Sequence, residues 1–142
     1  MSRDQKPQRV VGLTLIAGAI LTIIGIRFWV FPDQATSTFG LDPDNPGLGF
    51  ERMISLRDIW LGLLAVGFAL LREWRALMLW FGLGALVCWA DATLVINADG
   101  PTAAVAFHAV SGIFCLALAV SCWQLYKRES QTTPNRSGLT SD

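Results

Sequence analysis

Five ionisable side chains fall within, or at the edge of, long apolar segments of this 142-residue chain. They are Arg27, Arg57, Asp58, Asp91 and His108. Burying a charge in hydrocarbon is costly, so such residues are rare in membrane spans and usually face a bundle interior or a watery cavity. Two carboxyl groups, an imidazole and guanidinium groups together suit acid–base chemistry or the binding of an anionic or carbonyl group.

The arrangement of these groups along the chain suggests separate roles. Asp58 directly follows Arg57, whereas Asp91 is expected to face His108, so the two carboxyl groups would have different environments. Divergent protonation states of two nearby groups suit proton transfer or acid–base catalysis. We therefore predict hypothetical acid–base or orienting roles for Asp58, Asp91 and His108. The predicted ligand-binding residues are Arg57, Arg27 and Ser111.

A purely structural explanation of the same residues is equally open. Arg57 can form an ion pair with Asp58 or Asp91 that fixes helix register, while His108 donates to a neighbouring carboxylate. Arg27 can extend its guanidinium to the lipid headgroups. One His and two Asp resemble a metal-binding facial triad, but no local spacing supports one, so no metal site is predicted.

The elements that must position these groups are four apolar runs. Hydrophobic residues make up 53% of the chain and charged residues 15%, and mean hydropathy is +0.47. Each run is near the roughly 20 residues that cross a bilayer core, where only helices satisfy the backbone in a chain of this kind. The sequence predicts an all-α bundle of four transmembrane helices, over residues 10–31, 54–71, 76–96 and 103–126.

A signal peptide is the alternative interpretation of the first run, but the run is longer than the apolar core of a normal signal peptide and no small-residue cleavage site follows it. We therefore predict a retained first span that ends in the aromatic residues Phe28, Trp29 and Phe31. A short interfacial helix is predicted after it, because Pro32 suits a helix start and Gly40 a helix end. Ala35 and Phe39 would share one face of this short helix.

Basic residues set the predicted orientation. With both termini cytoplasmic, residues 1–9 form a cytoplasmic segment, residues 10–126 the membrane domain and residues 127–142 a disordered cytoplasmic tail. The predicted location is a cell membrane, inner or plasma. The basic residues then divide as follows: cytoplasmic Arg3, Lys6, Arg9, Arg72, Arg75, Lys127, Arg128 and Arg136, and non-cytoplasmic Arg27, Arg52 and Arg57.

In this topology the five ionisable groups share one depth. Arg27 lies at the outer end of the first span, and Arg57 and Asp58 lie about one turn into the second. Asp91 comes shortly before the outer end of the third span, and His108 shortly after the outer start of the fourth. At 1.5 Å per residue these positions lie roughly 5–8 Å from the outer boundary.

Small residues at helical spacing mark the expected contact faces, because they let helix backbones approach closely in membranes. Asp58, Asp91 and His108 fall on these stripes, where lipid is excluded. The stripes are Thr14, Gly18, Thr22 and Gly25; Asp58, Gly62, Ala65, Ala69 and Arg72; Gly84, Cys88, Asp91 and Val95; and His108, Ser111, Gly112, Cys115, Ala119 and Cys122.

Several function classes are excluded or disfavoured. Net charge is zero and no basic stripe appears, so nucleic-acid binding is not expected. Cys88, Cys115 and Cys122 lie in predicted spans without a CxxC pair, and are interpreted as small apolar fillers. No ligand set for haem, flavin or an iron–sulfur cluster is visible, so no cofactor is predicted.

The order of motifs resembles small uncharacterised DoxX-like membrane proteins. The resemblance rests first on residues 25–28 (GIRF), which are followed by Phe31-Pro32, Ala35 and Phe39-Gly40. It rests second on residues 55–63 (SLRDIWLGL), which contain an Arg-Asp-(three residues)-Gly element. Asp91 and His108 complete it, whereas Ser55 stands where a glycine is expected. It implies a four-helix membrane bundle of unknown function, and some DoxX-like relatives are associated with quinone-linked redox complexes.

Three functions follow as hypotheses. The first is binding, with transformation as an extension, of a small lipophilic molecule in a polar pocket in the non-cytoplasmic half. The second is an accessory or scaffolding subunit, with a membrane-protein partner or a second copy of the chain. The third is a small proton-coupled transporter, although no inverted repeat is evident. Membrane lipid is the common partner of all three.

Overall fold

The computed structural model describes residues 5–39 and 50–132, which form five helices and, within those ranges, no strand. Four of the helices are long and apolar enough to cross a membrane. The predicted all-α, four-span bundle is therefore confirmed. The helices are α1 (Gln5–Val30), α2 (Pro32–Phe39), α3 (Phe50–Leu71), α4 (Trp74–Asn97) and α5 (Thr102–Thr132).

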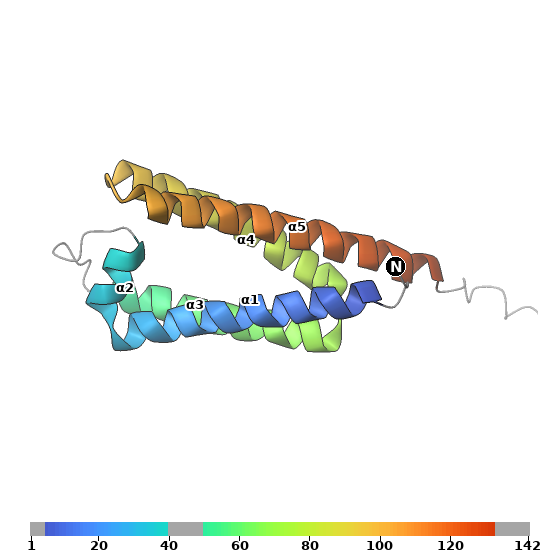
Figure 1. Ribbon diagram of the computed structural model, residues 1–142. Coiled ribbons are helices and arrows are strands. Elements are labelled where there is room, and N and C mark those ends of the chain that lie inside the picture. The colour runs from blue at the N-terminus through green and yellow to red at the C-terminus, as the bar shows by residue number, and fades with distance from the viewer. Residues whose placement is uncertain (1–4, 40–49, 133–142) are drawn as a thin grey trace, which may run out of the picture.

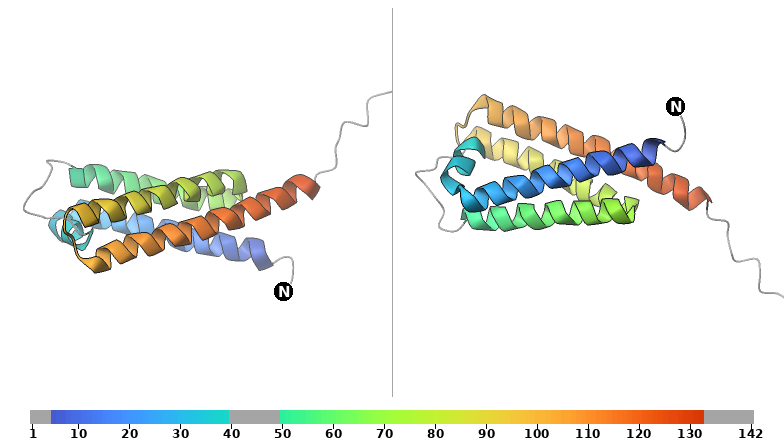
Figure 2. Two further views of the ribbon diagram at one scale, coloured as in Figure 1. Left: turned by 90° about the horizontal axis from the view of Figure 1, so that it is seen from above. Right: turned by 60° about the horizontal axis from the view of Figure 1, so that its bottom comes forward.

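The four long helices form two pairs (Figure 1). α1 lies along α3, and α4 lies along α5, with far fewer contacts between the pairs than within them. The pairs approach one another where α1 begins and α5 ends, and they diverge toward the end that carries α2 (Figures 1 and 2). Both described ends of the chain thus lie at the same end of the bundle.

Glycine allows the close approach of α1 and α3. A Cβ atom added to Gly62 would lie 2.5 Å from the Gly18 carbonyl oxygen, and one added to Gly18 would lie 2.8 Å from the Gly62 carbonyl oxygen. Neither helix could approach as closely with a larger residue here. Two turns closer to α2, the Ser55 hydroxyl donates to the Gly25 carbonyl oxygen at 2.7 Å, which links the same two helices.

Contacts between the two pairs concentrate in the half away from α2. A buried apolar cluster there draws on all four long helices. A second, smaller cluster of Phe28, Ala35 and Ile54 seats α2 on the α1–α3 pair at the opposite end. The larger cluster consists of Val10, Ala69, Trp74, Leu77, Phe81, Leu118, Ala119, Cys122 and Leu125.

Most predicted boundaries agree with the structure, and one needs correction. α2 covers residues 32–39 as predicted, while Gly40 and the side chain of Phe39 lie outside what is described. α5 continues to Thr132, so residues 127–132 are helical, contrary to the prediction that disorder begins at residue 127. The reason is a contact that the sequence did not suggest: the Trp74 indole N–H donates to the Glu129 carboxylate at 2.6 Å. Residues 133–142 lie outside the described range.

Candidate functional site

The helix boundaries place three of the predicted site residues at matching positions. Asp58 lies eight residues after the start of α3 at Phe50, Asp91 six before the end of α4 at Asn97, and His108 six after the start of α5 at Thr102. Six to eight residues of helix correspond to about 9–12 Å. All three helix ends belong to the α2 end of the bundle (Figure 1), so the three side chains originate at one level.

Arg57 and Asp58 form an ion pair on α3. The Arg57 Nε donates to the Asp58 Oδ1 at 2.9 Å. The Asp58 side chain is 8% exposed, whereas the Arg57 side chain is 41% exposed. A guanidinium carries five N–H donors in a planar fork. Because the bond to Asp58 uses Nε, both terminal nitrogens of Arg57 stay outside it.

α4 and α5 contribute Asp91 and His108 to the same layer as Arg57 and Asp58. His108 is buried and its ring lies edge-on to that of Phe107, with centroids 5.6 Å apart. Asp91 is half-buried and lies close enough to Arg57, His108 and Asp58 to interact with them electrostatically. The attraction between Asp91 and Arg57 connects one helix pair to the other, whereas the carboxylates of Asp91 and Asp58 repel each other.

The predicted stripe on α4 is displaced from the face that is buried. Asp91, Gly84 and Cys88 are only half-buried, and of the predicted stripe Val95 alone is fully buried. α4 also packs large apolar side chains, and these shift the buried face by about one residue. The buried residues of α4 are Trp74, Leu77, Phe81, Ala85, Ala92 and Val95. Asp91 therefore lies at the margin of the helix contact rather than at its centre.

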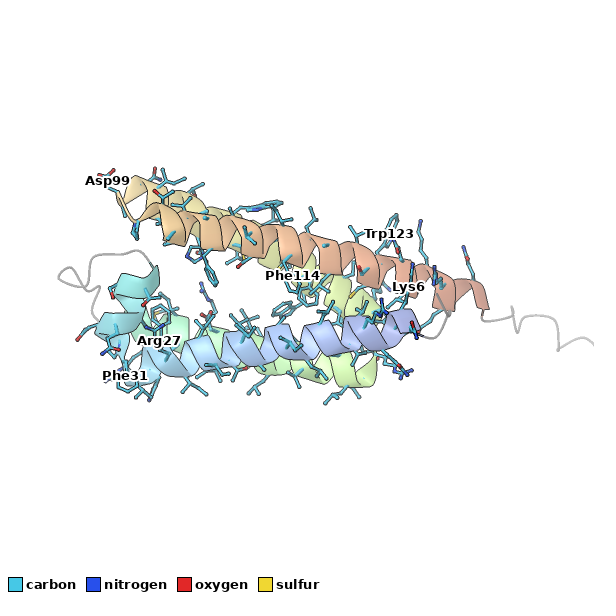
Figure 3. The ribbon with its side chains drawn as sticks, in the orientation of Figure 1. Lys6, Arg27, Phe31, Asp99, Phe114 and Trp123 are labelled. Carbon is cyan, nitrogen blue, oxygen red and sulfur yellow. The ribbon has the colours of Figure 1, made fainter. Side chains whose placement is uncertain are left out.

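The remaining predicted ligand residues lie further from this layer or beside it. Arg27 is exposed and donates to the Thr38 hydroxyl of α2 at 3.0 Å, so it holds the short helix against α1. Figure 3 shows Arg27 at the α2 end, as it does Phe31 and Asp99, whereas Lys6 and Trp123 lie toward the opposite end. Ser111 is half-buried, one turn along α5 from His108. Ligand binding by Arg27 and Ser111 stays a prediction.

One buried polar residue near the site was not selected from the sequence. Ser55 is fully buried, three residues before Asp58, and its bond to Gly25 holds α3 to α1 beside the ion pair. Its position where the DoxX-like pattern has glycine was the available signal, because a small hydroxyl residue at a helix contact can donate across it. Within residues 5–39 and 50–132, no group of three or more His, Cys, Asp or Glu side chains is arranged to hold a metal ion.

Four long apolar helices define a multi-pass integral membrane protein. Residues 18–122 match the family model described as Domain of unknown function (DUF4267), so the chain belongs to that family. The match includes every predicted site residue from Arg27 to Ser111. No curated protein and no solved structure matched the chain. The family description names no activity and no DoxX relationship, so that relationship stays a prediction.

Proposed function

We propose that this protein binds a small amphipathic molecule, with a lipophilic body and an anionic or carbonyl head group, in the non-cytoplasmic half of its bundle. The supporting observation is the polar layer of Arg57, Asp58, Asp91 and His108, in which Asp91 interacts with Arg57 and Asp58 of the other helix pair and with His108 of its own pair. The layer lies where the pairs diverge and outside the apolar cluster that joins them. Polar groups kept in hydrocarbon at a cost are expected to serve function.

The geometry of Arg57 suggests its role in this proposal. Asp58 fixes the guanidinium through Nε, and the half-exposed fork then presents its terminal nitrogens to a head group. Planar guanidinium groups bind carboxylate and carbonyl oxygens with directional N–H donors. Asp91 and His108 of the other pair would orient the same head group or exchange a proton with it. Ser111 would add a hydroxyl from the next turn of α5.

Orientation and relationship form part of the proposal. Both described ends of the chain lie at one end of the bundle, with six basic residues near it, which favours the cytoplasmic side of a cell membrane. Kinship with DoxX-like proteins would rest on the Arg-Asp element and on Asp91 and His108. The six basic residues are Lys6, Arg9, Arg72, Arg75, Lys127 and Arg128.

A second candidate is an accessory subunit of a larger membrane complex. Gly12, Gly67 and Gly82 have nothing within 4 Å of the position that a Cβ atom would occupy. Glycines on open helix faces suit close packing against another helix from outside the chain. This candidate predicts a protein partner in fixed stoichiometry and no dependence on the polar layer.

Native mass spectrometry of gently solubilised protein tests the proposal. The wild-type chain should retain a bound small molecule, and Arg57→Gln should lose it, because removing a charged hydrogen bond of about 1.5–3 kcal/mol weakens binding roughly 10–100-fold. Arg52→Gln is the matched control, since Arg52 lies on the same helix, is exposed and contacts the Trp29 ring at 5.8 Å. It should retain the molecule.

Equal retention in Arg57→Gln and the wild type would contradict the proposed role of the polar layer. A stoichiometric protein partner without any small molecule would favour the accessory-subunit function instead.

A further inference from the structure

Two of the three cysteines face each other across the contact between α4 and α5. The thiols of Cys88 and Cys115 are close enough to interact with each other. We infer that Cys88 and Cys115 form a redox-active dithiol, which a lipid-soluble organic disulfide converts to an intramolecular disulfide bond. This inference does not depend on the ligand proposed above.

Neighbouring contacts place the same two helix segments together independently of the thiols. A Cβ atom added to Gly84, one turn before Cys88, would lie 3.9 Å from the Cys115 sulfur. On the other side, a Cβ atom added to Gly112 would overlap the indole ring of Trp89. Glycines on both helices thus let the two backbones approach closely beside the thiols. Disulfide bonds need Cα atoms about 4.4–6.8 Å apart, which requires such an approach.

The third cysteine provides an internal contrast. Cys122 is completely buried in the apolar cluster, whereas Cys88 and Cys115 are only half-buried and each keeps part of its surface accessible. Thiol reactivity depends on access as well as on formation of the thiolate. The interpretation as an apolar filler therefore suits Cys122, and the other two cysteines differ from it in access and in contact.

The reaction is a pair of thiol–disulfide exchanges. One protein sulfur attacks the organic disulfide, forms a mixed disulfide and releases one thiol. The second protein sulfur then attacks the first, which forms the Cys88–Cys115 bond and releases the second thiol. The protein loses two electrons and two protons, and the organic disulfide gains both as two free thiols.

The position of the pair connects it with the polar layer. Cys88 lies one helical turn from Asp91 on α4, and Cys115 lies two turns from His108 on α5. A covalent bond between the helices would fix the relative positions of the segments that carry Asp91 and His108. Oxidation is therefore expected to restrict motion of this helix pair near the polar layer.

The test uses the intact protein in membranes and 2,2′-dipyridyl disulfide as the lipid-soluble probe. After denaturation and maleimide labelling, the untreated chain should carry three adducts, one for each free cysteine. The treated chain should carry one adduct, on Cys122, with two equivalents of thiopyridone released. Peptide mapping should then show Cys88 joined to Cys115 within one chain.

Single variants keep the test decisive. Cys122→Ser should still release two equivalents and retain no adduct, whereas Cys88→Ser and Cys115→Ser should each stop at a mixed pyridyl disulfide. Comparable elution of all variants from a sizing column establishes that they are folded. Three remaining adducts on the treated wild type, or a bond that involves Cys122, would overturn the inference.

Discussion

Single polar residues at helix contacts determine the position of the helix segments that carry the polar layer. Ser55 is the clearest case, because its buried hydroxyl donates across the α1–α3 contact to the Gly25 carbonyl oxygen. Arg57 and Asp58 follow within one turn on the same helix. A hydrogen bond between helices next to an ion pair keeps the part of α3 near α2 in a defined position relative to α1.

Replacing Ser55 with Ala should lower the free energy of unfolding by about 1 kcal/mol, because one buried hydrogen bond between helices is lost. Reversible unfolding in mixed detergent and lipid measures the change. Ser121→Ala is the control, since the Ser121 hydroxyl donates within its own helix to the Ala117 carbonyl at 2.8 Å. A loss no larger in Ser55→Ala than in this control would contradict a role for Ser55 between helices.

At the level of helix pairs, glycine determines how closely α1 and α3 approach each other. Gly62 meets backbone atoms of α1, which cannot move aside as a flexible side chain would. The α1–α3 contact must therefore widen when any side chain is added at this position. Gly67, more than one turn further along the same helix, has open space around it.

Gly62→Ala should lower the free energy of unfolding by about 1–3 kcal/mol, the usual cost of an enlarged residue in a packed contact. Gly67→Ala should be neutral or raise stability by up to about 1 kcal/mol, because Ala favours helix over Gly. Thermal unfolding of the two variants in the same detergent gives the comparison. Equal stability of the two would show that α1 and α3 do not approach at Gly62.

The helices and part of the candidate site could be predicted from the sequence. Apolar runs of bilayer length predict helices strongly, and small residues such as Gly18 and Gly62 marked the α1–α3 contact. Two features depended on partners distant in sequence: the extension of α5, held by Trp74 and Glu129, and the half-buried position of Asp91. Periodicity within one helix cannot reveal which large side chains of its neighbours compete for a face.

The described part of the molecule consists of two helix pairs that are joined by an apolar cluster in one half and by the attraction between Asp91 and Arg57 in the other. Asp91 interacts with Arg57 and Asp58 across the pairs at the end where these diverge. A ligand bound in this layer would contact both pairs at once. The proposed function and its location both depend on this shared layer.

A double-mutant cycle on Arg57→Gln and Asp91→Asn tests the shared layer most directly, with the free energy of unfolding as the measured quantity. Both substitutions remove a charge; Asp91→Asn preserves the side-chain shape, and Arg57→Gln shortens the side chain but keeps a polar amide. Residues that interact across the pairs should give a coupling energy above about 0.5 kcal/mol, whereas independent sites add within roughly 0.3–0.5 kcal/mol. We predict clear coupling between Arg57 and Asp91, and strictly additive effects would contradict a common polar layer.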